Sequence, residues 1–329
     1  MKRDVRAEVT RVDHQTPESV TLTLRPNENW RGLRAGQFVN VSVEIDGVRE
    51  TRPYSPAGSQ HAADGALELT VSTHPEGLVS RHLRDHARPG TIVGLTQAQG
   101  DFVLPDRRPE RVLLISGGSG ITPVMAMLRT LCDEGSAGAS EIGFLNYARS
   151  RELALYGAEL DRLAERHDGL RVARGFTRER RPALTGRFRG EHPRGVISEH
   201  ASAATFVCGP PALIESVRAV WARDGLAEPT VEMFTPPALS FDTAGAKGTV
   251  SFAASGREAA NSGLPLLEQA EDAGLAPDHG CRMGICNTCS CRKTAGTVRN
   301  LFTGAISSAG EEQIRICVSV PVGDVALDL

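Results

Sequence analysis

Apolar and polar residues alternate along much of the first hundred positions, which is the pattern of half-buried β-strands. Alternation runs through residues 20–24, 39–45 and 67–71, and the second of these segments ends at Asp46-Gly47, a typical hairpin turn. Short strands at this spacing are typical of small barrels. We therefore predict an antiparallel β-barrel domain over residues 1–105.

The pattern changes near Pro105 to strands that alternate with helices. Near-continuous apolar segments at residues 111–116, 141–147 and 205–208 indicate buried strands. One intervening helix is expected to carry an apolar face made of Leu153, Tyr156, Leu160 and Leu163. This alternation predicts an α/β domain with a parallel sheet over residues 106–235.

A third region follows a segment rich in proline and small residues, which we interpret as a linker over residues 236–247. Beyond it we expect a hairpin at residues 249–254, a helix at 264–273 and closing strands. The last domain, residues 248–329, is therefore predicted to be α+β.

Composition narrows the class of protein. At 329 residues, the chain is long enough for two or three domains, and its 40% hydrophobic and 23% charged residues are ordinary for a globular protein. A net charge of −3 argues against nucleic acid as a partner. The basic N-terminus has no apolar segment behind it, and glycines and Pro123 interrupt the apolar stretch at 112–131. We expect a cytoplasmic protein without a membrane span.

Four of the seven cysteines carry the most specific chemical signal. Cys281, Cys286 and Cys289 are spaced C-x4-C-x2-C, and Cys317 follows downstream. This spacing resembles that of plant-type ferredoxins, in which four thiolates hold a 2Fe–2S cluster. Zinc sites usually contain paired C-x2-C units, of which there is one here, so a zinc knuckle or unreactive buried thiols are the weaker alternatives.

The residues around these cysteines fit the same interpretation. Gly280 and Gly284 can take a positive φ and turn backbone N–H groups towards the cluster. Cys291 is interpreted as a strand residue and Cys132 as a core residue. The segments Leu264–Lys293 and Ile316–Leu329 resemble the corresponding parts of plant-type ferredoxins, which have a β-grasp fold.

Two motifs in the barrel region suggest a bound flavin. Arg52-Pro53-Tyr54-Ser55 offers a cation for a phosphate, a flat ring for stacking and a hydroxyl for a ring nitrogen. Gly77 begins a turn into a helix whose first amides, near Ser80, can bind a pyrophosphate. Taken alone, the first motif could equally be a set of exposed side chains without a ligand, and the second could equally be an ordinary helix cap.

Two strand ends in the second region suggest a dinucleotide. The first strand runs into a glycine turn that ends at Thr122 and Pro123, which we expect to be the N-cap and the first helical residue. Another strand breaks at Val207–Pro211. Glycines at two strand ends of one parallel sheet are typical of a dinucleotide site.

In this order the motifs resemble the ferredoxin–NADP reductase superfamily, and the domain order resembles that of oxygenase and desaturase reductases with a C-terminal 2Fe–2S ferredoxin domain. The resemblance implies a flavin site, with FAD favoured over FMN, formed by Arg52, Tyr54, Ser55, Gly77, Ser80 and Phe234. It implies that the nicotinamide nucleotide is bound by Gly117, Gly118, Gly120, Thr122, Cys208 and Gly209. Ser55, Thr122 and Cys208 are the expected catalytic residues.

The choice of nucleotide depends on the 2′-phosphate of the adenosine. Thr177-Arg178-Glu179 resembles the corresponding segment of NADP-specific relatives, and Arg149, Arg151, Arg180 and Arg181 add positive charge. A solvated arginine-rich loop is the alternative. NADPH is therefore favoured over NADH.

The resemblance implies a reductase that passes electrons from NAD(P)H through FAD to the 2Fe–2S cluster. The acceptor would be a terminal oxygenase, a di-iron hydroxylase or desaturase, or a haem monooxygenase. Two other functions stay open from the sequence. They are a dedicated electron-transfer subunit of another redox enzyme, and a non-catalytic redox sensor that binds zinc and a nucleotide.

Overall fold

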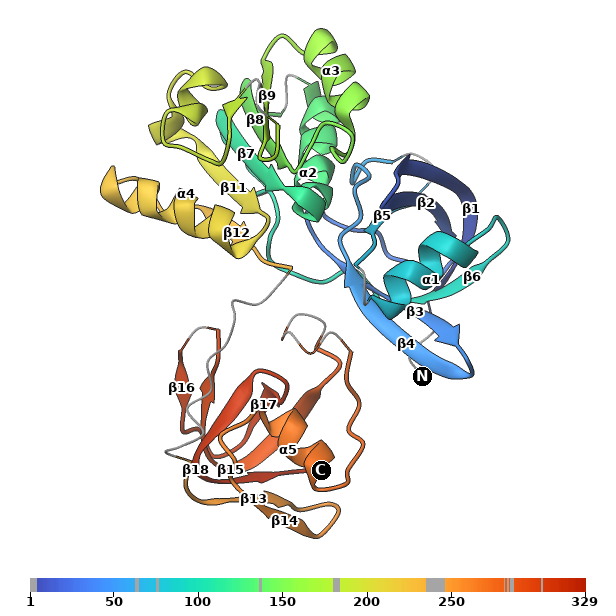
Figure 1. The fold of residues 1–329 in the computed structure, drawn as a ribbon, viewed down its shortest axis with the longest axis vertical. Helices are drawn as coiled ribbons and strands as arrows, with labels where there is room; N and C mark the ends of the chain where they lie inside the picture. Colours follow the sequence, from blue (N-terminus) through green and yellow to red (C-terminus); the bar gives the residue numbers. More distant parts are fainter. Residues whose placement is uncertain are drawn as a thin grey trace. The chain divides into compact units, whose positions relative to one another are not determined.

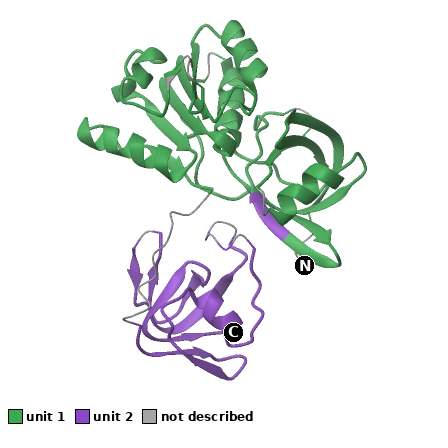
Figure 2. Cartoon of the chain, viewed as in Figure 1, with its two compact units in different colours: residues 1–50, 54–234 green, residues 51–53, 235–329 purple. Residues whose placement is uncertain are grey.

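The computed structural model describes residues 5–62, 65–74, 77–135, 138–179, 184–234, 246–280, 282, 284, 287–302 and 304–329 (Figure 1). The chain divides into two compact units (Figure 2). One contains residues 1–50 and 54–234, and the other contains residues 51–53 and 235–329. Of the predicted linker, residues 236–245 lie outside the described residues. Within the described part, no helix has the length and apolar character needed to cross a bilayer.

The N-terminal domain contains an antiparallel sheet with strand order β4-β3-β6-β1-β2-β5 in the described residues. The strands are β1 (Val5–Thr16), β2 (Ser19–Pro26), β3 (Val39–Ile45), β4 (Val48–Tyr54), β5 (Leu67–Ser72) and β6 (Ile92–Leu95), and helix α1 spans Leu78–His86. The predicted alternation is confirmed, because the apolar side chains of β2, β3 and β5 enter one core. The predicted β3–β4 hairpin is also confirmed, since Asp46 and Gly47 both have a positive φ, 52° and 77°.

The second domain is built on a parallel sheet with strand order β10-β9-β8-β7-β11-β12. The strands are β7 (Arg111–Gly117), β8 (Glu141–Ala148), β9 (Leu170–Phe176), β10 (Leu184–Thr185), β11 (Ala204–Cys208) and β12 (Thr230–Glu232). The helices are α2 (Ile121–Glu134), α3 (Gly157–Arg166) and α4 (Pro211–Arg223). From β7 the chain adds β8, β9 and β10 on one side of the sheet, and it then returns to add β11 and β12 on the other side of β7. A crevice for a dinucleotide is expected at this reversal, beyond the carboxyl ends of β7 and β11.

The predicted helical face from Leu153 to Leu163 is partly wrong. Helix α3 begins only at Gly157, because Tyr156 has a left-handed backbone with φ of 58°. The Tyr156 ring is buried, and its hydroxyl forms a hydrogen bond with Thr70 of β5. A tertiary contact with the barrel therefore determines where this helix starts, and Leu160 remains the buried residue of its face.

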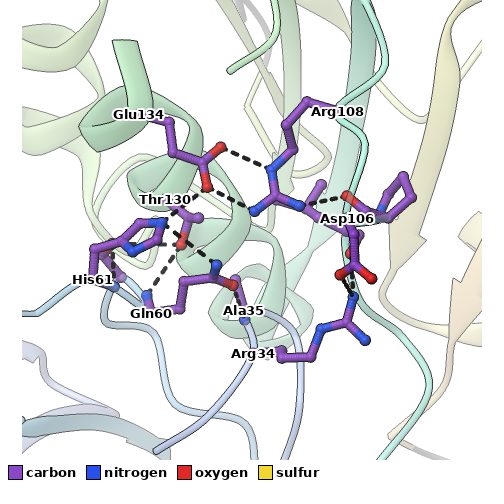
Figure 3. A network of polar contacts seen from close by, with 11 residues as sticks. Arg34, Ala35, Gln60, His61, Asp106, Arg108, Thr130 and Glu134 are labelled. Atoms are coloured by element: carbon purple, nitrogen blue, oxygen red, sulfur yellow. Dashed lines mark hydrogen bonds and ion pairs between the residues drawn. The ribbon is translucent and has the colours of Figure 1, made fainter. Parts of the chain in front are cut away.

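Polar side chains join the barrel domain to the nucleotide domain in the first unit. Figure 3 shows barrel loops and the connection between the two domains held at the C-terminal end of α2. Glu134 accepts two hydrogen bonds from Arg108, at 2.6 and 2.8 Å, and one from His61 at 2.9 Å. Nearby, the backbone N–H of Gln60 donates to the Thr130 hydroxyl at 3.1 Å. These contacts come from segments far apart in the sequence.

Arg129 forms a second junction in the same unit. It lies 2.9 Å from Glu68 of the barrel and 2.7 Å from Glu159 of α3, and it also donates to the carbonyl of Ala57 at 2.9 Å. Burial lowers the pKa of the guanidinium, but the two carboxylates outweigh this effect and raise it overall. Arg129 therefore stays charged and ties α2 to both neighbouring segments.

The C-terminal unit contains a mixed sheet and one helix, the arrangement expected for a β-grasp domain. The strands are β13 (Thr249–Phe252), β14 (Arg257–Ala260), β15 (Ser290–Asn300), β16 (Ile306–Ser307), β17 (Glu312–Arg315) and β18 (Ser319–Leu327), and α5 spans Leu266–Asp272. Among the described strands the order is β14-β13-β18-β15-β16, with β17 also paired to β15. The predicted hairpin near residue 249 and the helix after it are confirmed, and Leu266, Leu267 and Ala270 pack into the core below the sheet.

Candidate functional site

The carboxyl ends of β7 and β11 approach each other closely because they carry glycines. Strand pairing places Ser116 opposite Cys208, and the next residues on each strand are Gly117 and Gly209. A Cβ atom added to Gly117 would lie 2.8 Å from a methyl carbon of Leu213, and one added to Gly120 would lie 2.4 Å from the Cys208 carbonyl oxygen. Side chains at these positions would therefore push these segments apart, whereas glycine allows their close packing.

Thr122 does not cap the helix as expected. Helix α2 starts at Ile121 and its N-cap is Gly120, which ends a short 3-10 turn that begins at Gly118 with φ of 56°. Thr122 lies inside the first helical turn, is 3% exposed, and its hydroxyl donates to the Ser119 carbonyl at 3.2 Å. The extra 3-10 turn moves the cap position two residues upstream.

Three polar groups from the two domains, two of them buried and one partly buried, meet beside these strand ends. Cys208 on β11 is paired with Glu232 on β12, and the Ser55 hydroxyl, just after β4, donates to the Glu232 carboxylate. Ser55 is 4% and Cys208 0% exposed. Glu232 is partly exposed, but its Oε2 atom is buried and has no hydrogen-bond partner among the described residues. An orphaned carboxylate oxygen here is suited to contact a bound ligand.

Burial controls the ionisation of Glu232 and Cys208. It raises the pKa of Glu232 to about 8, although the hydrogen bond from Ser55 opposes the rise. Burial also raises the pKa of the Cys208 thiol well above its usual range, and the nearby Glu232 adds to this effect. Near neutral pH, Cys208 is therefore a thiol and Glu232 is mostly protonated. The site holds a carboxylic acid, a thiol and a hydroxyl in a low-dielectric environment.

Glu232 is a site residue that the sequence interpretation missed. In the sequence it is only a near neighbour of Phe234, which packs partly buried against the core of the nucleotide domain. The available signal was a carboxylate at the carboxyl end of a strand. Its partner Ser55 lies in another domain, so the sequence could not show the contact.

The predicted flavin residues lie at the end of β4 and at the start of α1. Arg52 and Tyr54 lie at the end of β4, and the Tyr54 ring packs against the barrel core. Gly77 is the N-cap of α1, and a Cβ atom there would lie 2.4 Å from the Ser80 hydroxyl oxygen. That hydroxyl donates to the Gly77 carbonyl at 3.2 Å. The residues thus present a cation, an aromatic ring and the first turn of a helix, which fit a flavin with a phosphate chain.

The predicted 2′-phosphate residues meet at the ends of β8 and β9. The Arg178 backbone N–H donates to the Arg149 carbonyl at 2.9 Å, and that of Thr177 donates to Ala148 at the same distance. Arg178 is exposed and has no ion-pair partner among the described residues, whereas Arg149 pairs with Glu18 of the barrel. Arg180 and Arg181 lie outside the described residues. At this edge Arg178 therefore has an exposed guanidinium without an ion pair among the described residues, while the neighbouring Glu179 carboxylate accepts a hydrogen bond from the Arg151 N–H.

Two of the four predicted cluster ligands can be located, since Cys281 and Cys286 lie outside the described residues. Cys289 and Cys317 are buried, and their Sγ atoms are 3.1 Å apart, well beyond the roughly 2.05 Å of a disulfide. The Gly284 N–H donates to the Cys317 sulfur at 3.2 Å. Two sulfurs that converge beside a backbone donor fit the thiolate set of an iron–sulfur cluster.

The loop that carries these cysteines is anchored from both sides. Gly284 has φ of 69°, as expected for a backbone that turns its N–H towards sulfur, and a Cβ atom there would lie 2.8 Å from Val318. Arg282, with φ of 53°, forms a two-pronged ion pair with Glu271 of α5. Cys291 is confirmed as a buried strand residue of β15, and Cys132 as part of a core cluster.

A barrel with a flavin motif, a parallel sheet with glycines at two neighbouring strand ends and a domain with converging cysteines together define a class. They describe a pyridine-nucleotide-dependent oxidoreductase that contains a flavin and an iron–sulfur cluster. Comparison with family models agrees. An oxidoreductase FAD-binding domain matches residues 7–104, an oxidoreductase NAD-binding domain matches 114–219, and a 2Fe-2S iron-sulfur cluster binding domain matches 253–322.

Curated relatives match most or nearly all of the chain. The chain is 35% identical to an NADPH oxidoreductase of Mycobacterium tuberculosis, over 99% of this chain and 85% of the relative. It is 29% identical to the glycine betaine monooxygenase reductase subunit of Pseudomonas aeruginosa, over 90% and 87% of the two chains. The chain therefore belongs to the ferredoxin–NADP reductase superfamily, in the branch of reductases with a C-terminal 2Fe–2S ferredoxin domain.

Solved structures show the same fold. Phthalate dioxygenase reductase superposes with a TM-score of 0.65 at 20% identity, covering 99% of this chain and 98% of its own. A type IV self-sufficient cytochrome P450 monooxygenase superposes with a TM-score of 0.73 at 21% identity, covering 99% of this chain and 41% of its own. The protein is thus an NAD(P)H-dependent flavin and iron–sulfur reductase, and the cysteine pattern belongs to a 2Fe–2S domain rather than to a zinc knuckle.

Proposed function

We propose that the cluster formed by Ser55, Cys208 and Glu232 marks the place where the nicotinamide meets the flavin. The convergence of these three groups carries the proposal, because they join the end of the flavin motif to the carboxyl ends of β11 and β12. FAD supplies the chemistry that accepts electrons in pairs and passes them on singly. The residues themselves exclude water, present a hydroxyl and a neutral acid, and hold the reacting rings in position.

The remaining predicted residues take roles around this cluster. Arg52, Tyr54, Gly77 and Ser80 hold the FAD, and Phe234 lies beside it. The glycine turn from Gly117 to Gly120, Thr122 and Gly209 lie along the nucleotide. Cys281, Cys286, Cys289 and Cys317 hold the 2Fe–2S cluster. The domain boundaries proposed from the sequence lie near residues 105, 235 and 247, and the cluster of Ser55, Cys208 and Glu232 is formed across the first of them.

NADPH is the proposed electron donor. Among the described residues, Arg178 carries an uncompensated charge at the edge of the sheet where the adenosine half of a dinucleotide would lie, and the loop presents Thr177 beside it. A guanidinium binds a phosphate dianion strongly, whereas an NAD site would present an acidic partner to the ribose. The relative named NADPH oxidoreductase supports this choice.

The proposed acceptor is a terminal oxygenase. Two relatives support an acceptor that activates oxygen, one named as a reductase subunit of glycine betaine monooxygenase and the other as a component of 1,2-phenylacetyl-CoA epoxidase. The choice among a Rieske oxygenase, a di-iron hydroxylase or desaturase and a haem monooxygenase can be tested by adding each class of enzyme to the reduced protein.

One experiment tests the order of electron transfer. In Cys289→Ser, NADPH-dependent reduction of cytochrome c should be lost, while ferricyanide reduction, which accepts electrons from the flavin, should continue. Cys291→Ser is the matched control, because Cys291 is also buried and lies only two residues away, in β15. Equal loss of both activities in Cys289→Ser would show that electrons do not pass through the flavin before the cluster.

A further inference from the structure

An ion pair connects the flavin barrel to the edge of the nucleotide sheet. Glu18 lies in the tight turn between β1 and β2, and its Oε2 atom pairs with the Nη2 atom of Arg149, the first residue after β8. The two side chains are 44% and 47% exposed. Because both groups are partly solvated, the pair can exchange partners at little cost in free energy.

The backbone of Glu18 is held firmly in place. Its carbonyl accepts hydrogen bonds from the Thr73 N–H at 2.8 Å and from the Thr73 hydroxyl at 3.0 Å. Its own N–H donates to the Thr16 hydroxyl at 3.2 Å. The Glu18 carboxylate therefore projects from a turn whose backbone is fixed by hydrogen bonds, and only the Glu18 side chain is free to move.

Arg149 and Arg178 are neighbouring cations, of which only Arg149 is paired with a carboxylate. A backbone hydrogen bond joins the two residues at the ends of adjacent strands. Glu18 neutralises Arg149, whereas Arg178 has no acidic partner among the described residues. A phosphate at this edge would therefore meet one available guanidinium and one that a carboxylate already occupies.

We propose that Glu18 is a specificity-determining residue, whose carboxylate competes with the 2′-phosphate of NADPH for Arg149. This inference rests on the proposed NADPH site. The phosphate carries about two negative charges, so it must displace the carboxylate or bind beside it. NADH has no phosphate at this position and meets no such opposition. Glu18 thus reduces the preference for NADPH over NADH, and the flavin domain takes part in selecting the nucleotide.

The variant Glu18→Gln removes the charge and keeps the size of the side chain. We expect the Kd for 2′,5′-ADP to fall about threefold to tenfold, the range expected from freeing one exposed ion pair and removing one like charge. The Kd for 5′-ADP should change less than about twofold, because that probe lacks the phosphate. In steady-state assays kcat/KM should rise for NADPH and stay constant for NADH. The gain should shrink in high salt, which screens exposed charges.

Two controls isolate the contact. Glu8→Gln removes another barrel carboxylate of the same hairpin, paired with Arg25 at 2.6 Å, and should leave both affinities unchanged. The double variant Glu18→Gln/Arg149→Ala should show no gain over Arg149→Ala alone, since the effect requires the freed guanidinium.

Arg178→Ala separates failure of this inference from failure of the proposed NADPH site. If Arg178→Ala weakens 2′,5′-ADP binding and Glu18→Gln leaves it unchanged, the competition is disproved and the site stands. If Arg178→Ala has no effect on 2′,5′-ADP, the site itself is disproved, and the inference with it. Equal gains for both probes in Glu18→Gln would also overturn the proposal.

Discussion

Removing the ionisable group at Glu232 should change how the stability of the protein depends on pH. The folded pKa is about 8, above the ordinary value of 4.5, because burial disfavours the charged carboxylate. Folding therefore binds a proton. The stability that Glu232 contributes is fully present below about pH 4.5 and is lost as the pH rises through 8. Glu232→Gln mimics the protonated form and should not show this loss.

The size of the effect follows from the shift in pKa. A rise of this extent corresponds to about 5 kcal/mol at most, at about 1.4 kcal/mol for each pH unit. Glu232 is partly exposed, so we reduce the figure to about 2 kcal/mol. In a domain pair of this size, that equals a change of about 4–8 °C in Tm.

Calorimetry of the flavin-loaded protein at pH 5, 7 and 9 measures the difference. Between pH 5 and pH 9, the Tm of the wild type should fall by about 4–8 °C relative to the Tm of Glu232→Gln. Glu165→Gln, which changes an exposed carboxylate on α3, is the control and should follow the wild type at every pH. Parallel curves for the wild type and Glu232→Gln would refute the argument that Glu232 is protonated in the folded protein at neutral pH.

Two further substitutions test the ferredoxin loop and the domain junction. Gly284→Ala should destabilise the ferredoxin domain by about 2–4 kcal/mol, because the residue has a left-handed backbone and the new Cβ atom would lie 2.8 Å from Val318. Unfolding in guanidinium, followed by the loss of the absorbance of the cluster, measures this change in unfolding free energy. Gly310→Ala, in open space in the same domain, should cost less than about 0.5 kcal/mol, and equal losses would contradict the steric argument. Arg129→Met should lower the unfolding free energy of the first unit by about 2 kcal/mol, since it leaves the carboxylates of Glu68 and Glu159 without the guanidinium that pairs with them. Thermal unfolding would show this, and an effect no larger than that of Arg25→Met, which breaks an exposed pair, would argue against the junction.

Much of the fold could be predicted from local patterns. Alternation in β2, β3 and β5 depends on one buried face, and the Asp46-Gly47 turn requires a positive φ at both residues, so each leaves a clear trace in the sequence. The start of α3 could not be predicted, because Tyr156 takes a left-handed backbone next to Thr70 of another domain. The prediction of Thr122 as a cap is wrong, since nothing local distinguishes a helix start from one preceded by a 3-10 turn.

The sequence by itself determined the chemical components of this protein: the spacing of the four cysteines, the glycines at two strand ends and the flavin motif at the end of β4. Most of these features are local, because the first three cysteines, the glycine turn and the flavin motif each need particular residues within a few positions of one another. Only Cys317 lies farther along the chain, 28 residues after Cys289. Only the tertiary structure decided the contacts between distant segments. It placed Ser55 against Glu232 and Glu18 against Arg149, and it raised the pKa of Glu232 by burying it. Burial and charge pairing depend on which surfaces pack together, and that information is spread over the whole chain.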